Sequence, residues 1–312
     1  MARSLKKVGS RPILVTGSHR SGSTWAGEML ALSKSVAYIH EPFNVTDEIS
    51  INPDQFKFWF HYVYDENAGD AEIIIRNILE YKYPLLSNLK KCRSARHLAK
   101  LCRDQMLSVG HSVHSRRALL KDPIALFSAE WLAETFDMDV LVMVRHPAAF
   151  CSSLKIKNWH HDFNHFLRQP ALMSRYLDSY HNDISAAAAN KLSVIDQAIL
   201  LWNCVHHTIN QYKSEHSSWT FARHEDLSMN PISGFEGIYS KFNIPFDAAT
   251  KKAILNRTGD HNPAEQVERN EFVRNSKASV KNWKLRLSSE EIDHVKKYTS
   301  EVAAHLYDDS DW

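Results

Sequence analysis

Glycine and cysteine are both scarce in this chain. Only 9 of the 312 residues are glycine, and two of these glycines fall within one short loop. In a sequence with so little glycine, that loop is informative. The cysteines, Cys92, Cys102, Cys151 and Cys204, form no C-x-x-C pair, which favours free thiols in a reducing compartment over a disulfide scaffold. The sequence has no run of about 18 apolar residues, and segment 1–12 is basic without the apolar stretch of a secretory signal. We therefore expect a cytoplasmic protein with no membrane span.

The remaining composition is that of a globular enzyme-sized domain. Hydrophobic residues make up 44% and charged residues 24%, which is enough for a full core. The net charge is +2 and no nucleic-acid module is recognisable, so we expect no nucleic-acid partner. We predict one domain over 1–312.

Apolar periodicity predicts strands alternating with helices. The predicted strands are 13–18, 36–40, 117–121, 139–145 and 218–223. The predicted helices are 23–34, 55–66, 72–83, 95–107, 122–136, 146–156, 194–214 and 288–307, with Asp122 as an N-cap and a capping box from Ser288 to Glu291. This alternation predicts an α/β fold: a mostly parallel central sheet flanked by helices, a three-layer sandwich like that of P-loop nucleotide triphosphatases.

The loop 17–24, GSHRSGST, nearly spells the phosphate-binding pattern G-x-x-x-x-G-K-[ST]. It follows a predicted strand and precedes a predicted helix, so its amides and the helix N-terminus favour an anion. Ser23 replaces the usual lysine, and Arg20 supplies a cation three residues earlier. The strand 139–145 ends in Arg145 where a magnesium-binding aspartate would be expected in a triphosphatase. The pattern favours an anion that is shorter than a triphosphate, is attached to a 5′ position and is bound without a metal ion.

The run R-S-G-S-T-W at 20–25 resembles the 5′-phosphosulfate loop of the sulfotransferases that use 3′-phosphoadenosine 5′-phosphosulfate (PAPS). Arg145 and Ser153, eight residues apart after a core strand, resemble that family's 3′-phosphate motif, and an arginine there can bind a phosphate in bidentate geometry. The resemblance implies that PAPS and its product PAP are bound by Ser18, His19, Arg20, Ser21, Gly22, Ser23, Thr24, Trp25, Arg145 and Ser153.

Two looser matches follow in the same order as in the family. Segment 272–284 contains Arg274 and a Trp-Lys pair, but not the family's glycines, so whether Arg274 closes over the 3′-phosphate is left open. His224 occupies the place of a tyrosine that the family keeps near the adenine. Both residues are candidate contacts for the donor.

The resemblance also implies catalytic residues. Arg20 would stabilise the leaving 5′-phosphate, and Lys121 falls where the family keeps a lysine that touches the sulfuryl group. Pro123 occupies the position of the usual histidine base, so the base must lie elsewhere. Glu41, in a Glu-Pro context like that of carbohydrate-directed members, is the first candidate and Asp122 the second.

The acceptor side of the site is expected in two helical insertions, near 45–115 and 158–190. Residues 90–121 are strongly basic, which suits either a solvated face or a cleft for an anionic glycan. One or two of the aromatic residues in 56–64 could stack on a sugar ring. His161 and His165 have metal-ligand spacing but no third ligand, so we favour a pocket wall or a surface loop there.

These observations favour a sulfotransferase that moves the sulfuryl group of PAPS to a hydroxyl, most simply of a carbohydrate. Two alternatives remain: a P-loop kinase with an altered loop, and a non-catalytic protein that binds a phosphorylated nucleotide. The acceptor and the oligomeric state are not specified by any motif.

Overall fold

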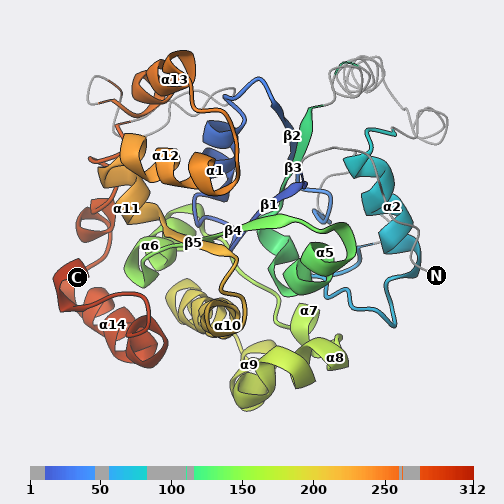
Figure 1. Cartoon of the computed structure of the whole chain (residues 1–312). Coiled ribbons are helices and arrows are strands. Elements are labelled where there is room, and N and C mark those ends of the chain that lie inside the picture. Colours follow the sequence, from blue (N-terminus) through green and yellow to red (C-terminus); the bar gives the residue numbers. More distant parts are fainter. Residues whose placement is uncertain (1–10, 46–55, 83–109, 111–115, 260–261, 263–274) are drawn as a thin grey trace, which may run out of the picture.

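The computed structural model describes residues 11–45, 56–82, 110, 116–259, 262 and 275–312. Their centre is a five-stranded sheet in the order β2-β3-β1-β4-β5, and every neighbouring pair is parallel (Figure 1). The strands are β1 (Ile13–Thr16), β2 (Val36–His40), β3 (Arg117–Lys121), β4 (Asp139–Val144) and β5 (Thr220–Arg223). All five coincide with predicted strands, so the predicted α/β fold with a parallel sheet is confirmed.

Helices follow the strands and cover both faces of the sheet. The α-helices are α1 (Ser23–Leu30), α2 (Gly69–Leu79), α5 (Ala129–Phe136), α6 (Pro147–Lys157), α7 (Asn164–Leu167), α8 (Pro170–Leu172), α9 (His181–Ala189), α10 (Val194–Glu215), α11 (His224–Met229), α12 (Pro231–Lys241), α13 (Ala248–Thr258) and α14 (Ser289–Ala303). The 3₁₀ and π segments are η1 (Pro123–Ser128), η2 (Met173–Leu177), η3 (Asp178–Tyr180), η4 (Asn282–Leu285) and η5 (Asp309–Asp311). The capping box predicted from Ser288 to Glu291 is present at the start of α14.

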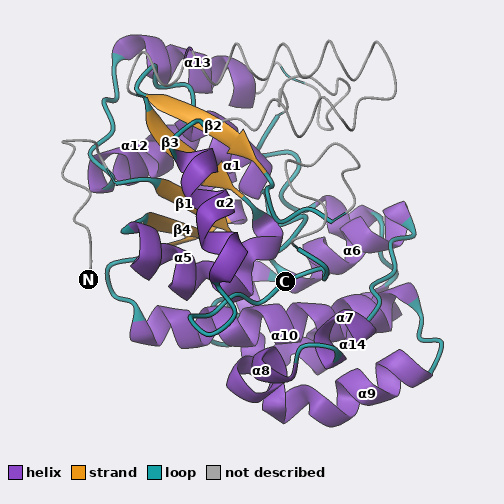
Figure 2. Ribbon diagram, turned by 90° about the vertical axis from the view of Figure 1, so that its right-hand side faces the viewer, coloured by secondary structure: helices purple, strands orange, loops and turns teal. Residues whose placement is uncertain are grey.

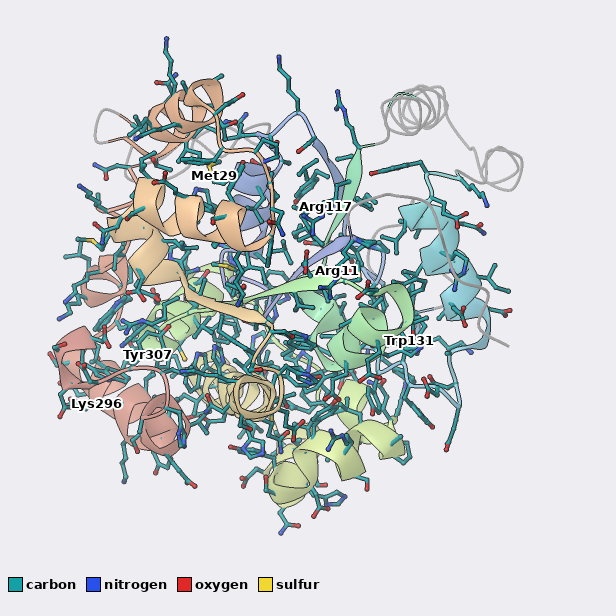
Figure 3. All side chains as sticks on the ribbon, viewed as in Figure 1. Arg11, Met29, Arg117, Trp131, Lys296 and Tyr307 are labelled. Carbon is teal, nitrogen blue, oxygen red and sulfur yellow. The ribbon has the colours of Figure 1, made fainter. Side chains whose placement is uncertain are left out.

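The sheet separates two hydrophobic cores, because alternate residues of each strand point to opposite faces. Ile13 and Val15 of β1 pack with α1, α11, α12 and α13, whereas Leu14 packs with α5, α6, α10 and α14. Figure 2 shows helices on both sides of the strands, and Figure 3 labels Met29 and Trp131, which belong to the two different cores. The three inner strands β1, β3 and β4 are buried on both faces, as interior parallel strands are, whereas the edge strands β2 and β5 are partly exposed.

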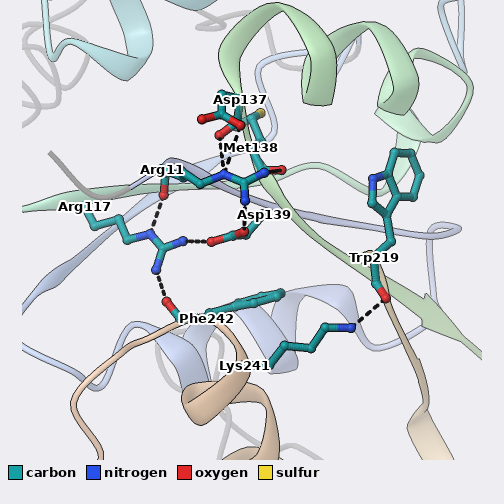
Figure 4. Close-up of polar contacts among 8 residues, drawn as sticks. All are labelled: Arg11, Arg117, Asp137, Met138, Asp139, Trp219, Lys241 and Phe242. Carbon is teal, nitrogen blue, oxygen red and sulfur yellow. Dashed lines mark hydrogen bonds and ion pairs between the residues drawn. The ribbon is translucent and has the colours of Figure 1, made fainter. Parts of the chain in front are cut away.

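The amino ends of the strands are held by ion pairs (Figure 4). Arg117 is buried at the start of β3 and donates to the carbonyl oxygens of Arg11 and Phe242 and to the Asp139 carboxylate. Arg11 also pairs with Asp137 at 3.0 Å and with Asp139 at 3.3 Å. The charged side chains at this edge therefore pair with one another and stabilise the sheet.

Two helix predictions need correction. The helix predicted over 55–66 is wrong: from Phe56 to Asn67 the described backbone is irregular, and Phe60 has a positive φ of 58°. Its amides bond to side chains instead of to each other, for example Val63 N–H to Ser128 Oγ at 2.8 Å. The helix predicted over 122–136 divides into η1 and α5, and the division falls at that same Ser128.

Several predicted features lie outside the described residues, namely the helix over 95–107, Cys92, Cys102 and most of the basic segment. Cys151 and Cys204 are buried free thiols, as predicted. None of the described helices combines the length and apolar character that a bilayer span requires.

The carboxyl ends of the strands meet at one edge of the sheet, where open α/β sheets bind their ligands. β1 lies between β3 and β4 at the centre of the sheet. The chain leaves β1 through the glycine loop, β2 through Glu41, β3 through Asp122, β4 through Arg145 and β5 through His224. The sheet therefore gathers residues that are far apart in sequence.

Candidate functional site

The loop between β1 and α1 is shaped by two close contacts of its backbone. A β-carbon on Gly17 would lie 2.4 Å from the Met143 carbonyl oxygen, and one on Gly22 would lie 2.3 Å from His224 Cδ2. Both glycines also have positive φ angles, 143° and 92°, which other residues adopt only with strain. Glycine is required at both positions, and the loop delivers its backbone directly to the N-terminus of α1.

Arg20 joins this loop to the carboxyl end of β4 and to α6. Its Nε donates to Ser153 Oγ at 2.8 Å, and its carbonyl oxygen accepts a hydrogen bond from Arg145 Nη1. Burial and then the nearby charge of Arg286 lower the pKa of Arg20, although an arginine stays cationic at neutral pH. The two motifs that the sequence assigns to one ligand are therefore in direct contact.

Arg145 is held from behind by a buried network. Trp202 Nε1 donates to its carbonyl oxygen at 2.9 Å. Glu225 accepts from His146 N–H and from the Tyr307 hydroxyl, each at 3.0 Å. Burial lowers the pKa of Arg145 to about 10, while the charge of Glu225 opposes that change. Arg145 Nε is buried and finds no hydrogen-bond partner in the described part of the chain, which is costly for a guanidinium and suits an anionic ligand.

Glu41 and Lys121 form an ion pair where β2 and β3 end. Lys121 Nζ contacts the Glu41 carboxylate, and Asn44 Nδ2 donates to the same carboxylate at 2.8 Å. The Glu41 side chain is 18% exposed, whereas Lys121 is fully buried. Burial acts to raise the pKa of Glu41, but the charge and hydrogen bond of Lys121 outweigh it, so this pKa lies below its ordinary value. Glu41 is therefore an ionised carboxylate with access to ligand.

Asp122 has no comparable access. Its Oδ2 accepts from Phe43 N–H at 2.6 Å and its Oδ1 from Ile124 N–H at 3.1 Å, which makes it the N-cap that the sequence predicts. Burial raises the pKa of Asp122 to about 7, and the negative charge of Glu41 adds to that increase. Both oxygens are occupied by backbone amides, so the geometry favours Glu41 as the reactive carboxylate.

One cavity of about 370 Å³, which we call the loop cavity, brings most of the predicted residues together. Its predicted lining residues are His19, Arg20, Gly22, Ser23, Thr24, Trp25, Glu41, Arg145 and His224. Ser18, Ser21, Ser153 and Lys121 are buried and do not line it. Arg274 lies outside the described residues.

Five further lining residues were not predicted: Asn44, Trp59, Pro123, Ile124 and Trp159. Asn44 could have been suspected from its place three residues after Glu41. Trp59 and Trp159 come from the aromatic and histidine-rich segments that the sequence marks as an acceptor side. Their rings meet edge to face with centroids 5.8 Å apart, and no local pattern predicts that contact.

Of the two alternatives for the histidine-rich segment, the structure shows a pocket wall. His161 and His165 both line a second, smaller cavity, with ring centroids 6.3 Å apart. Within the described ranges the one group of three residues with metal-ligand spacing is Glu130, Glu215 and His216. The guanidinium of Arg175 lies 3.5 Å from both carboxylates of that group, so both carboxylates already pair with a positive charge.

Comparisons with known proteins point in one direction. Residues 12–200 match a family model described as the sulfotransferase family. Carbohydrate sulfotransferase 1 of Homo sapiens is 34% identical over 89 residues, which cover 28% of this chain and 21% of that protein. The Danio rerio protein of the same name is 26% identical over 91 residues, covering 29% and 21%. The match thus spans about a fifth of the length of these curated relatives.

A solved structure shares the fold over nearly the whole chain. The sulfotransferase domain from the curacin biosynthetic pathway superposes with a TM-score of 0.52 and covers 96% of this chain and 98% of that one. Sequence identity is 14%, so this likeness concerns the arrangement of helices and strands alone.

Proposed function

The chain belongs to the sulfotransferase family, and we propose that it moves the sulfuryl group of PAPS to a hydroxyl of a carbohydrate acceptor. The observation that carries this proposal is the loop cavity, which is lined by the phosphate-type loop, Arg145 and Glu41 together. A donor-binding surface and an ionised carboxylate thus face one space.

The residues present suit a donor with two separate anionic groups. Gly17 and Gly22 let the loop backbone pack directly against Met143 and His224, which fixes the position of the loop at the start of α1. Arg145 lines the loop cavity, and its buried Nε has no hydrogen-bond partner among the described residues, so it can donate to a phosphate oxygen. Arg20 and the amides at the start of α1 lie at the glycine loop, so a nucleotide with a 5′ and a 3′ phosphate group would meet a separate group of donors at each phosphate.

When bound, PAPS supplies a sulfuryl group activated by its link to the 5′-phosphate. Arg20 and the amides at the start of α1 would neutralise the charge that develops on the leaving phosphate oxygen. Ser153 Oγ accepts from Arg20 Nε, so its own O–H would remain free to donate to the 3′-phosphate. Arg145 would bind the 3′-phosphate through its guanidinium.

Glu41 would act as the general base. Its carboxylate accepts the proton of the acceptor hydroxyl while that oxygen bonds to sulfur and the bond from sulfur to the 5′-phosphate oxygen breaks. Lys121 keeps Glu41 ionised and oriented, since its buried ammonium contacts the carboxylate. Lys121 would then act through Glu41. The family resemblance implies that Lys121 touches the sulfuryl group, and such a contact would require its ammonium group to leave the Glu41 carboxylate.

The carbohydrate acceptor is supported by the partial match to the carbohydrate sulfotransferases, and by Trp59 and Trp159, which line the loop cavity together with Glu41. We further propose that residues 1–312 act as one domain and that the segments near 45–115 and 158–190 contact the acceptor. The cytoplasmic location stays a prediction.

Calorimetry with PAP and with ATP and magnesium would test the proposal. We expect PAP to bind without magnesium and at least as tightly as ATP does with it. A preference for ATP with magnesium would replace this proposal with the kinase alternative. PAP binding without transfer of labelled sulfur to any hydroxyl acceptor would favour the non-catalytic alternative.

A further inference from the structure

A second cavity of about 170 Å³ adjoins the loop cavity. We call it the histidine cavity; its lining residues are His19, Trp59, Leu154, Trp159, His160, His161, Asp162 and His165. His19, Trp59 and Trp159 line both cavities, so these three side chains are a shared wall. A ligand in the histidine cavity would lie against the same residues that face Glu41.

The shared wall is aromatic and partly open. The His19 ring lies 5.0 Å from the Trp159 ring and 5.7 Å from the Trp59 ring. Trp159 is 36% exposed although it is among the largest side chains in the protein. An indole at this position offers a ligand an apolar face with a polar edge.

Hydrogen bonds fix this wall in place. Trp59 N–H donates to His165 Nδ1 at 3.3 Å, and His165 O accepts from Gln169 Nε2 at 2.8 Å. His161 N–H donates to Gln197 Oε1 at 3.0 Å. Segments that are about a hundred residues apart in the chain are therefore tied into one preformed surface, as ligand sites usually are.

The charge of the histidine cavity differs from that of the loop cavity. No lysine or arginine is among its lining residues, whereas Arg20 and Arg145 line the loop cavity. Burial lowers the pKa of His19 and of His161 to about 3, so both imidazoles are neutral and can donate and accept hydrogen bonds. Burial slightly opposes ionisation of Asp162, but hydrogen bonds from Asn164 hold its pKa below the ordinary value. The surface thus attracts hydroxyl groups and repels anions.

Its size suits a single ring. Pockets for drug-sized ligands measure about 300–1,000 Å³, while an apolar cavity of about 150 Å³ is known to hold benzene. At about 170 Å³ the histidine cavity matches one six-membered ring. Aromatic faces, neutral hydrogen-bonding edges and this volume together describe a site for a pyranose.

We propose that the histidine cavity is the subsite for one uncharged sugar ring of the acceptor, bound against Trp159 and Trp59. This inference rests on the proposed function and narrows it, because it selects neutral over anionic sugars at this position. A ring bound there lies on the other side of the shared wall from Glu41, so a neighbouring sugar in the loop cavity would present its hydroxyl to that carboxylate.

Saturation-transfer NMR on the protein, recorded with and without PAP, tests the proposal with a matched pair of ligands. Methyl β-D-glucopyranoside and methyl β-D-glucuronide differ only at C6, which is a hydroxymethyl group in the first and a carboxylate in the second. We expect the glucoside to bind and Trp159→Ala to weaken it about three- to tenfold. Tyr298→Ala, which removes another exposed aromatic side chain on α14, should leave its binding unchanged.

Charge gives the second arm of the experiment. The glucuronide should bind about two- to fivefold more weakly than the glucoside, and Asp162→Asn should narrow that difference while keeping the acceptor for Asn164 N–H. Tighter binding of the glucuronide, no binding of either sugar, or an unaffected Trp159→Ala variant would each overturn the subsite. Titration of the same samples with PAP tests the donor assignment separately. Failure of PAP to bind would reject the donor assignment, whereas the sugar-binding results decide only on the subsite.

Discussion

Replacing Glu41 with glutamine tests whether its carboxylate is a base or a structural partner of Lys121. The amide keeps the size of the side chain and can still accept from Asn44, which donates to the carboxylate at 2.8 Å. It cannot take a proton from a hydroxyl. Loss of a general base lowers turnover by about 100- to 10,000-fold, or about 3–5 kcal/mol in activation free energy. PAP affinity should change little.

The same change also removes the counter-charge of Lys121, which is fully buried. Leaving one charge of a buried pair alone lowers the free energy of unfolding by about 3–5 kcal/mol. A fall in activity could therefore come from lost stability. The double variant Glu41→Gln/Lys121→Met separates the two effects, because replacing both members of a buried ion pair with neutral residues is often close to neutral for stability.

Two assays on the wild type, the single variant and the double variant complete the test. Urea unfolding should show a large decrease in the free energy of unfolding for Glu41→Gln, and most of that decrease should be absent in the double variant. Single-turnover transfer of labelled sulfur should stay lost in both. Recovery of transfer together with stability would refute the reasoning, since Glu41 would then be needed only as the partner of Lys121.

Two further predictions concern neighbouring groups. Arg145→Ala should weaken PAP binding about tenfold to 150-fold, the value of one or two charge-assisted hydrogen bonds, and change AMP binding little; equal losses in calorimetry would remove Arg145 from the 3′-phosphate. Burial raises the pKa of Asp122 to about 7. Below that pH the folded chain keeps a proton that the unfolded chain releases at lower pH. The free energy of unfolding should therefore fall as the pH rises towards 7, by at most about 1.4 kcal/mol per pH unit. Urea unfolding at pH 5 and 7.5 should show a smaller decrease for Asp122→Asn than for the wild type, and equal decreases would contradict that role.

The sheet and the loop were predictable because their signals are local. Each strand is a short apolar run, and the glycine loop stands between a strand and a helix, so the fold and the meeting of residues at one edge follow from the order of elements. The approach of Arg145 to Arg20 also follows, since β4 lies beside β1.

The acceptor side was not predictable in the same way. The aromatic run from Phe56 to Tyr64 has enough apolar residues for a helix, but its amides bond to Ser128, His165 and Gln169, which lie more than sixty residues away. Distant side chains replaced the local backbone hydrogen bonds that a helix would need. Lys121 illustrates the same limit: the sequence gives its position after β3 but not the direction of its ammonium towards Glu41.

The ion pairs around Arg117 have a consequence for how such a protein can change. They anchor the sheet at the end opposite to Glu41 and Arg145, so these charges contribute to folding without occupying positions that line the loop cavity. Libraries that randomise Trp59 and Trp159 and keep Gly17, Gly22, Asp122 and the Glu41–Lys121 pair should therefore retain a high fraction of folded members. New acceptor preferences could be selected from them without compensating stabilising mutations.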